Sequence, residues 1–223
     1  MNKQTSLCRF SLFALPLALS GCISLPFGGK TEEKPPPVMY TLNQPSAGVT
    51  DVATEAMGRL VVVVPAPEVP PGFDSERIAI QFEDGRVDYY ADAQWSARLD
   101  ELVQNVVIER AQQKLSGAIV GKSGVVPSPS YRLSVKVTSF GPLYKASADM
   151  PPRLNAGVDV TVIELPQETI RAQFSVSKTE MASENRLGTV TNNLRTLLNS
   201  ALDEALEKAA PYITEPQTIV RSN

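Results

Sequence analysis

The sequence contains no histidine and only two cysteines, Cys8 and Cys22. Without histidine, the chain lacks the commonest general base, the Ser-His and Cys-His nucleophile pairs, and nearly every kind of zinc site. Catalysis by serine, lysine or carboxylate groups alone stays chemically open. We nevertheless expect a protein that is not an enzyme and that has no catalytic residue, metal site or bound cofactor.

The chain also lacks an excess of positive charge. It contains 21 Lys and Arg against 24 Asp and Glu. Lys3 and Arg9 are the basic residues among the first 21, so the remaining chain has 19 basic and 24 acidic residues, a net charge of -5. Such a balance excludes a general electrostatic attraction to nucleic acid, and we expect no nucleic-acid partner.

The N-terminus does contain a secretion signal, and it ends at a cysteine. Lys3 and Arg9 precede or border a short apolar stretch, Phe10–Leu19, which is too short to cross a bilayer. The segment Leu19-Ser20-Gly21-Cys22 resembles the lipobox of bacterial lipoproteins. The resemblance implies that residues 1–21 are a cleaved signal peptide, that diacylglycerol is attached to the sulfur of Cys22, and that a fatty acid such as palmitate acylates the new amino terminus. The alternative is an ordinary cleaved signal that happens to be followed by a cysteine.

Lipids on Cys22 would hold the mature protein at a membrane. Each buried methylene contributes about 0.8 kcal/mol, and a single acyl chain anchors only marginally, so two lipid-bearing groups are needed for stable attachment. The next residue is Ile23 rather than the Asp that favours the inner membrane in enteric-type sorting. We therefore expect an outer-membrane lipoprotein that faces the periplasm, in preference to an inner-membrane one.

Composition divides the rest of the chain into three parts. Residues 22–37 contain the lipidated cysteine and a tether that ends in Pro35-Pro36-Pro37, which favours extended backbone. At roughly 3.1 Å per residue, this tether reaches about 45 Å. Residues 38–213 are long enough for one domain with its own core, and residues 214–223 are expected to form a flexible tail.

Within the domain, hydrophobic patterns predict seven strands. The run of four valines before Pro65 favours a strand that is apolar on both faces and therefore central. Asp84-Gly85 supplies the positive-φ residues of a tight hairpin. Three later segments alternate apolar and polar residues, which is typical of strands with one buried face. The expected strands are Val38–Leu42, Arg59–Val64, Arg77–Phe82, Arg86–Tyr90 and the segments that begin near Tyr131, Ala156 and Ile170.

Two segments have the period of amphipathic helices. Gln94–Leu115 carries apolar residues at helical spacing from Trp95 onward, with Asp92 as the expected N-cap and Gly117 as the expected stop. A second helix is expected from Glu184 or Gly188 to Ala210, closed by Pro211. Residues 116–130, which are rich in Gly, Ser and Pro, are expected to form a loop. The order of these elements predicts an α+β two-layer sandwich, a mainly antiparallel sheet with both helices packed on one face.

Two motifs come close to known sites without matching them. Gly117-Ala-Ile-Val-Gly121-Lys122-Ser123 has three residues between its glycines, whereas a phosphate-binding P-loop has four and precedes a helix, so we interpret it as a connector. The acidic residues around the hairpin could supply oxygen ligands to a hard cation, but their spacing matches no calcium loop. We interpret them as a solvated turn; they are Glu83, Asp84, Asp88 and Asp92.

Three aromatic residues lie close together at the start of the first expected helix. Trp95 is expected to pack in the core, because it begins the apolar stripe of that helix. Strand alternation would bury only one of Tyr89 and Tyr90, so the other is a candidate for docking a partner protein. We therefore name Tyr89 and Tyr90 as possible partner-docking residues.

The order of these parts resembles a known family. The lipobox, the short tether, Tyr40-Thr41-Leu42, the valine-rich strand with its proline-rich loop, and the junction Tyr89-Tyr90-Ala91-Asp92-Ala93-Gln94-Trp95 are similar to the PqiC-like ABC-type transport auxiliary lipoproteins. Ala97-Arg98 stands where members often carry proline and leucine after the tryptophan. The resemblance covers roughly residues 38–211.

The resemblance implies an accessory subunit of an MCE-type ABC transporter that moves lipids between the inner and outer membranes. Its partners would be an MCE-domain protein and, through it, an ABC permease and ATPase. The alternative function is an outer-membrane assembly or pilot lipoprotein that supports a β-barrel or a secretin. A hydrolase that uses Ser, Lys and carboxylates is the third hypothesis.

Overall fold

The computed structural model describes residues 35–43, 60–145 and 147–213. The chain divides into the units Met1–Pro35 and Pro36–Asn223, and the described strands and helices belong to the second. Cys22, the signal peptide, most of the tether and the tail 214–223 lie outside the described residues. In the described part of the chain, no helix is both long and apolar enough to span a bilayer.

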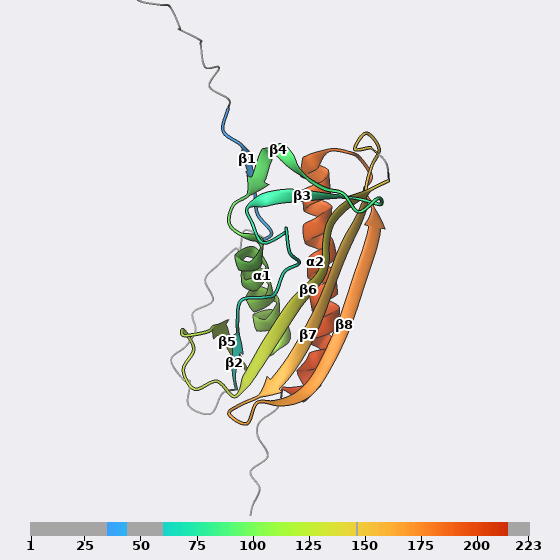
Figure 1. Ribbon diagram of the computed structural model, residues 1–223. Helices are drawn as coiled ribbons and strands as arrows, with labels where there is room; N and C mark the ends of the chain where they lie inside the picture. Colours follow the sequence, from blue (N-terminus) through green and yellow to red (C-terminus); the bar gives the residue numbers. More distant parts are fainter. Residues whose placement is uncertain (1–34, 44–59, 146, 214–223) are drawn as a thin grey trace, which may run out of the picture. The chain divides into compact units, whose positions relative to one another are not determined.

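The described residues form a sheet of eight strands with two helices (Figure 1). The helices are α1, Leu99–Lys114, and α2, Leu187–Ala209, which is followed by a 3-10 turn at Ala210–Tyr212. The strands are β1 Val38–Tyr40, β2 Val61–Val64, β3 Arg77–Phe82, β4 Val87–Trp95, β5 Ile119–Lys122, β6 Tyr131–Tyr144, β7 Arg153–Glu164 and β8 Thr169–Met181.

The long strand β6 organises the sheet. Along one edge it pairs antiparallel with β7, which pairs antiparallel with β8. Its other edge is shared, because β2 pairs parallel with its first residues and β3 pairs parallel with its last. The strand β5 then adds to β2, while β4 and β1 add to β3.

The expectation of a mainly antiparallel sheet is therefore wrong, since the sheet is mixed. Four of its strand pairs are parallel, β1–β4, β2–β5, β2–β6 and β3–β6. Parallel pairing requires a long crossover connection, and the chain between β2 and β6 contains a hairpin and α1. Alternation in the sequence shows which face of a strand is buried, but it does not show the direction of its neighbours.

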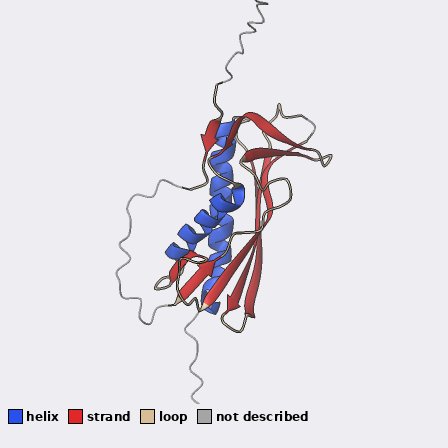
Figure 2. Ribbon diagram, turned by 60° about the vertical axis from the view of Figure 1, so that its left-hand side comes forward, coloured by secondary structure: helices blue, strands red, loops and turns tan. Residues whose placement is uncertain are grey.

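The core lies between the sheet and the helices, which Figure 2 shows on one side of the long strands. The helix α2 packs against β6, β7 and β8, and α1 packs beside α2 against β2 and β5. The predicted stripe of α2 is buried, including Val190, Leu194 and Leu198. The strands β6 and β7 bury the expected faces, but β8 buries only Val176, because it is an edge strand that extends past the cover of α2.

The junction between β4 and α1 differs from the expected one. The helix begins at Leu99 instead of Gln94, Arg98 occupies the N-cap position, and Asp92 lies within β4. Trp95 is the last residue of β4, where it pairs with Tyr40 of β1. Ala93 and Trp95 are both buried, which is the period of a strand, whereas the spacing from Trp95 to Leu99 imitates a helix.

The segment 116–130 is also more ordered than expected, because it contains β5. This strand pairs parallel with β2, residue by residue, from Val61 opposite Ile119 to Val64 opposite Lys122. Gly121 has no room for a side chain, since a Cβ atom there would lie 2.5 Å from Cγ1 of Val126. The Gly117–Ser123 motif thus contains β5, an edge strand of the sheet, and the next element along the chain is the strand β6.

The hairpin prediction is confirmed. Gly85 has a φ of +88°, and its N–H donates to the carbonyl oxygen of Phe82 at 3.0 Å. The Asp84 carboxylate accepts a hydrogen bond from the backbone N–H of Arg86 at 2.9 Å. Asp-Gly therefore closes the turn between β3 and β4 as its backbone preferences predict.

Glu204 of α2 binds Lys178 of β8 and Lys208 of its own helix, which gives a pH-dependent contribution to stability. Hydrogen bonds from Lys178 of β8 and, second, from Lys208 of α2 lower the pKa of Glu204 from 4.5 to about 2. A carboxylate with a depressed pKa stabilises the folded state above its unfolded pKa and loses this contribution as the pH falls toward its folded pKa. The difference in stability between the wild type and Glu204→Gln should therefore be complete at neutral pH and close between about pH 4.5 and pH 2.

Urea unfolding as a function of pH measures this difference. In a Lys178→Gln background, the stability difference between the protein that keeps Glu204 and the Glu204→Gln variant should shrink more than in a Lys208→Gln background. The reason is that the hydrogen bond to Lys178 is the larger cause of the lowered pKa of Glu204. An equal gap at neutral and acidic pH would contradict the assignment.

Candidate docking surfaces

Tyr89 is half-buried and already has two partners within the domain. Its hydroxyl donates to the carbonyl oxygen of Gly72 at 3.0 Å, which connects β4 to the proline-rich loop. The guanidinium of Arg77 lies 3.6 Å from the centre of its ring. One face of the ring is thus covered by a guanidinium, which reduces the surface that Tyr89 can offer to a partner.

Tyr90 lies on the other face of β4 and begins a chain of polar contacts. Its hydroxyl oxygen is 2.9 Å from that of Tyr144, and the Tyr144 hydroxyl donates to Oδ1 of Asn185 at 2.7 Å. Since a phenol has one proton, Tyr144 accepts from Tyr90. Asn185 in turn donates to the carbonyl oxygen of Ala148. Burial raises the pKa of both phenols, and the bond to Tyr144 raises the pKa of Tyr90 further.

This chain of hydrogen bonds joins four segments of the fold. It runs from β4 through β6 to the residues before α2 and to the connection between β6 and β7. Phe82 packs against Tyr144 with ring centres 5.9 Å apart and completes a small second core. Tyr89 and Tyr90 are both half-buried, so the expectation that alternation hides only one of them is too simple, and their role in docking stays a prediction.

Tyr144→Phe should lower the free energy of unfolding by about 1–3 kcal/mol, because it removes two hydrogen bonds, those to Tyr90 and Asn185, that contribute about 0.5–1.5 kcal/mol each. Tyr90→Phe is the matched control, since Tyr144 then keeps its bond to Asn185, and its cost should be about 0.5–1.5 kcal/mol. Chemical denaturation followed by circular dichroism measures both. If Tyr90→Phe lowered the free energy of unfolding more than Tyr144→Phe does, the assignment of Tyr90 as donor and Tyr144 as acceptor would be wrong.

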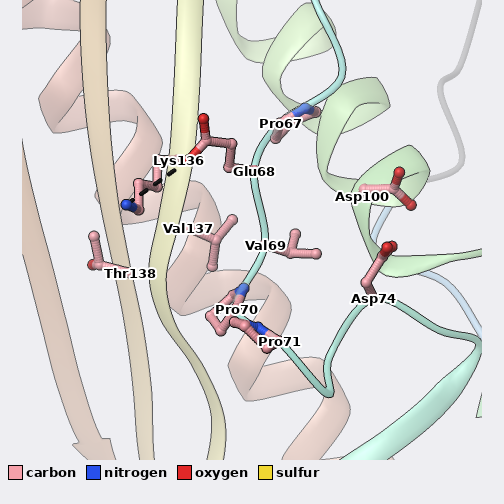
Figure 3. Close-up of a pocket in the computed structure, with 10 residues that line it drawn as sticks. All are labelled: Pro67, Glu68, Val69, Pro70, Pro71, Asp74, Asp100, Lys136, Val137 and Thr138. Atoms are coloured by element: carbon pink, nitrogen blue, oxygen red, sulfur yellow. Dashed lines mark ion pairs between the residues drawn. The ribbon is translucent and has the colours of Figure 1, made fainter.

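A pocket of about 630 Å³ lies where the proline-rich loop runs beside β6 (Figure 3). Val137 and Thr138 of β6 form one side, and the segment Pro67–Pro71 forms the other. Asp74 and Asp100 lie at the end away from β6. Neither aromatic candidate named from the sequence lines this pocket. The proline loop was recognisable in the sequence, but its position at the edge of β6 was not.

Backbone pairing of one residue holds this loop in place. The N–H of Glu68 donates to Val135 at 3.0 Å, and the N–H of Val137 donates to Glu68 at 2.8 Å. Glu68 therefore fills the edge of β6 between the parts that pair with β2 and β3. Proline has no N–H and cannot donate a hydrogen bond to a strand. In this proline-rich loop, Glu68 supplies both the N–H and the carbonyl oxygen that pair with β6.

Ion pairs occupy the charged groups of the pocket. Lys136 lies 3.8 Å from Glu68, and Arg98 binds both Asp74 and Asp100. The bond to Asp74, followed by the charge of Asp100, raises the pKa of Arg98 above its usual value. Arg98 carries one positive charge for two carboxylates, so the pocket keeps one negative charge in excess. The pocket therefore presents apolar prolines beside a few charged groups, which suits the docking of a polypeptide segment better than the binding of a strongly anionic ligand.

The acidic residues of the hairpin have separate roles. Glu83 lies 3.7 Å from Arg153 of β7, and the Asp88 carboxylate accepts a hydrogen bond from the N–H of Tyr89 at 2.7 Å. Asp84 serves the turn, and Asp92 lies in β4. Among the residues that the structure describes, no group of three or more Cys, Asp or Glu side chains could hold a metal ion.

The family follows from comparison with known proteins. The model of one family, the ABC-type transport auxiliary lipoprotein component, matches residues 40–210. The chain belongs to this family. As an auxiliary lipoprotein of ABC-type transport, it is a membrane-anchored protein associated with an ABC transport system.

Solved structures confirm the fold of this auxiliary lipoprotein. It is similar to protein XCC0632 from Xanthomonas campestris, a DUF330 family member, with 16% identity, a TM-score of 0.60, and coverage of 78% of this chain and 96% of that one. An uncharacterized protein of known structure gives 14% identity, a TM-score of 0.59, and coverage of 81% and 100%. No curated protein matches the sequence.

Proposed function

We propose that this auxiliary lipoprotein is a non-enzymatic subunit of an MCE-type ABC system that moves lipids between the inner and outer membranes. It acts by docking to an MCE-domain protein and, through that protein, to the permease and ATPase. The observation that carries the proposal is the family match over residues 40–210, which includes both helices up to Ala209 and seven complete strands.

The sequence supports a fixed position at the outer membrane. Cys22 ends a lipobox and is followed by Ile23, so the mature chain would be anchored by diacylglycerol and an N-acyl chain and would face the periplasm. The short tether keeps the domain near that membrane. A partner must therefore bring the cargo to it.

The described surface supports docking as the mode of action. The pocket lies beside a proline-rich loop whose backbone is restricted, and its lysine and most of its carboxylates already have ion-pair partners, so a mainly apolar or weakly basic partner segment could enter it. The absence of histidine from the whole sequence is consistent with a protein that catalyses no reaction. Energy would come from the ATPase partner.

Crosslinking in cells tests the partner. A photo-crosslinking residue at Pro71, on the rim of the pocket, or at Asp88, beside Tyr89, should capture an MCE-domain protein in the full-length lipoprotein. Ser200, an exposed residue of α2, is the matched position away from both candidates. Capture at Pro71 or Asp88 above the level at Ser200 is the expected result. If no position captures an MCE-domain protein, the transport proposal is wrong.

A further inference from the structure

Large apolar side chains are exposed at one end of the domain. Val38 and Met39 of β1 are 57% and 53% exposed, and Met150 and Met181 are 71% and 60% exposed. Met150 lies in the connection between β6 and β7, and Met181 is the last residue of β8, opposite Arg153 at the start of β7. We call these four residues the anchor-end patch.

A backbone contact joins the segment of Met150 to that of Met181. The N–H of Ala182, directly after Met181, donates to the carbonyl oxygen of Pro152 at 2.9 Å, two residues after Met150. Figures 1 and 2 show β1, β4, the connection between β6 and β7, and the last residues of β8 at the same end of the domain. The strand β5, the turn between β7 and β8, and the end of α2 lie at the opposite end.

We propose that the anchor-end patch rests on the lipid surface that holds Cys22, with Met150 and Met181 in its interfacial layer. This inference depends on the lipid attachment of the proposed function. The described chain begins directly before β1, so the covalent connection to Cys22 enters the domain at this end. The end that carries the patch is therefore the one to which the tether is attached.

The tether makes a weak apolar contact effective. A free domain would have to offset the loss of its overall motion when it binds a membrane, and four separate side chains are a small contact. Attachment through residues 22–37 makes the same contact intramolecular and gives it a high effective concentration. Methionine suits an irregular apolar surface, because its side chain is unbranched and flexible.

Charge indicates which lipid surface is suitable. Around the patch, Lys145 and Arg153 are offset by Glu83, Asp149 and Glu180, so this end has no cluster of basic residues of the kind that binds anionic lipids, as far as the described residues extend. We therefore infer a contact with a mainly zwitterionic surface. Because the contact is apolar, it should persist at high salt.

Fluorescence of single labels tests the contact in the full lipoprotein. The lipidated form has no other free cysteine, since Cys8 lies in the leader and the sulfur of Cys22 carries lipid, so an environment-sensitive fluorophore reports from one added cysteine. Met150→Cys and Met181→Cys place the label in the patch. Val125→Cys and Ile170→Cys are matched controls, because these side chains are 75% and 64% exposed and belong to the opposite end. The helix α2, with 23 residues, separates the ends by about 34 Å.

The labelled proteins are reconstituted into vesicles of phosphatidylethanolamine with a minor share of phosphatidylglycerol, with and without lipids that carry a spin label near the head group. At positions 150 and 181 we expect emission at shorter wavelength and its loss in the presence of the spin label, unchanged by high salt. At positions 125 and 170 we expect neither change. Equal quenching at both ends, or no quenching in protein that floats with the vesicles after a carbonate wash, would overturn the inference alone. Protein that fails to float would instead contradict the lipid anchor of the proposed function.

Discussion

Replacing Cys22 with serine is expected to release the protein from the membrane fraction and to leave the domain folded. The two lipid-bearing groups provide the anchor, at about 0.8 kcal/mol per buried methylene. Cys22 precedes the described domain, whose core is formed by residues from Leu42 to Ile213. Loss of the lipid should therefore change the location of the protein without changing its stability.

Fractionation after a high-salt and carbonate wash measures this effect, and circular dichroism of the released protein verifies its fold. Cys8→Ser is the matched control, because Cys8 belongs to the signal peptide and its replacement should leave anchoring intact. If Cys22→Ser stayed in the washed membranes, the lipobox assignment would be wrong. The anchor-end patch alone should not resist this wash, since its contact is effective only in the tethered protein.

Trp95→Ala is expected to lower the free energy of unfolding by about 3–5 kcal/mol. Trp95 is 2% exposed, and its ring centre lies 6.1 Å from that of Phe140 in β6. Its backbone N–H donates to Glu76 at 2.7 Å, and the residue pairs with Tyr40 in β1. The substitution would leave a cavity where β4, β6 and the start of α1 meet, and those backbone contacts limit how far the site can collapse.

Urea unfolding followed by circular dichroism is the appropriate measurement, because Trp95 is the only tryptophan in the chain and its fluorescence is lost in the variant. Val125→Ala is the control. This side chain is 75% exposed, so its truncation should change the free energy of unfolding by no more than about 0.5 kcal/mol. If Trp95→Ala unfolded at the same urea concentration as the wild type, the stability of the junction between β4 and α1 would not depend on the indole ring.

Much of the fold could be predicted where a single local pattern was strong. The hairpin at Asp84-Gly85 depends on the positive φ of Gly85 and on the carboxylate of Asp84, which accepts a hydrogen bond from Arg86. The helix α2 carries an apolar stripe over 23 residues. The burial of Trp95 was also predicted correctly, although its element was not. The strand β4 continues to Trp95 because β1 pairs with it there, and β1 is distant in the sequence.

The candidate site shows the same division. Tyr89 and Tyr90 were selected from the sequence, but the partners that occupy them, Gly72 and Tyr144, come from other segments. The pocket depends on Glu68, whose pairing with β6 could not be inferred from the loop alone, because prolines signal stiffness without showing which strand edge they cover.

By itself, the sequence determined the hydrophobic faces of β6, β7 and α2 and the turn at Gly85. These properties depend on residues that are neighbours in the chain. Only the tertiary structure decided the parallel pairs around β6, the strand β5, the end of β4 at Trp95, and the exposure of four apolar side chains at the end where β1 lies. Each of these features requires contact between segments that are far apart in sequence. The direction and register of such contacts depend on how the whole chain folds.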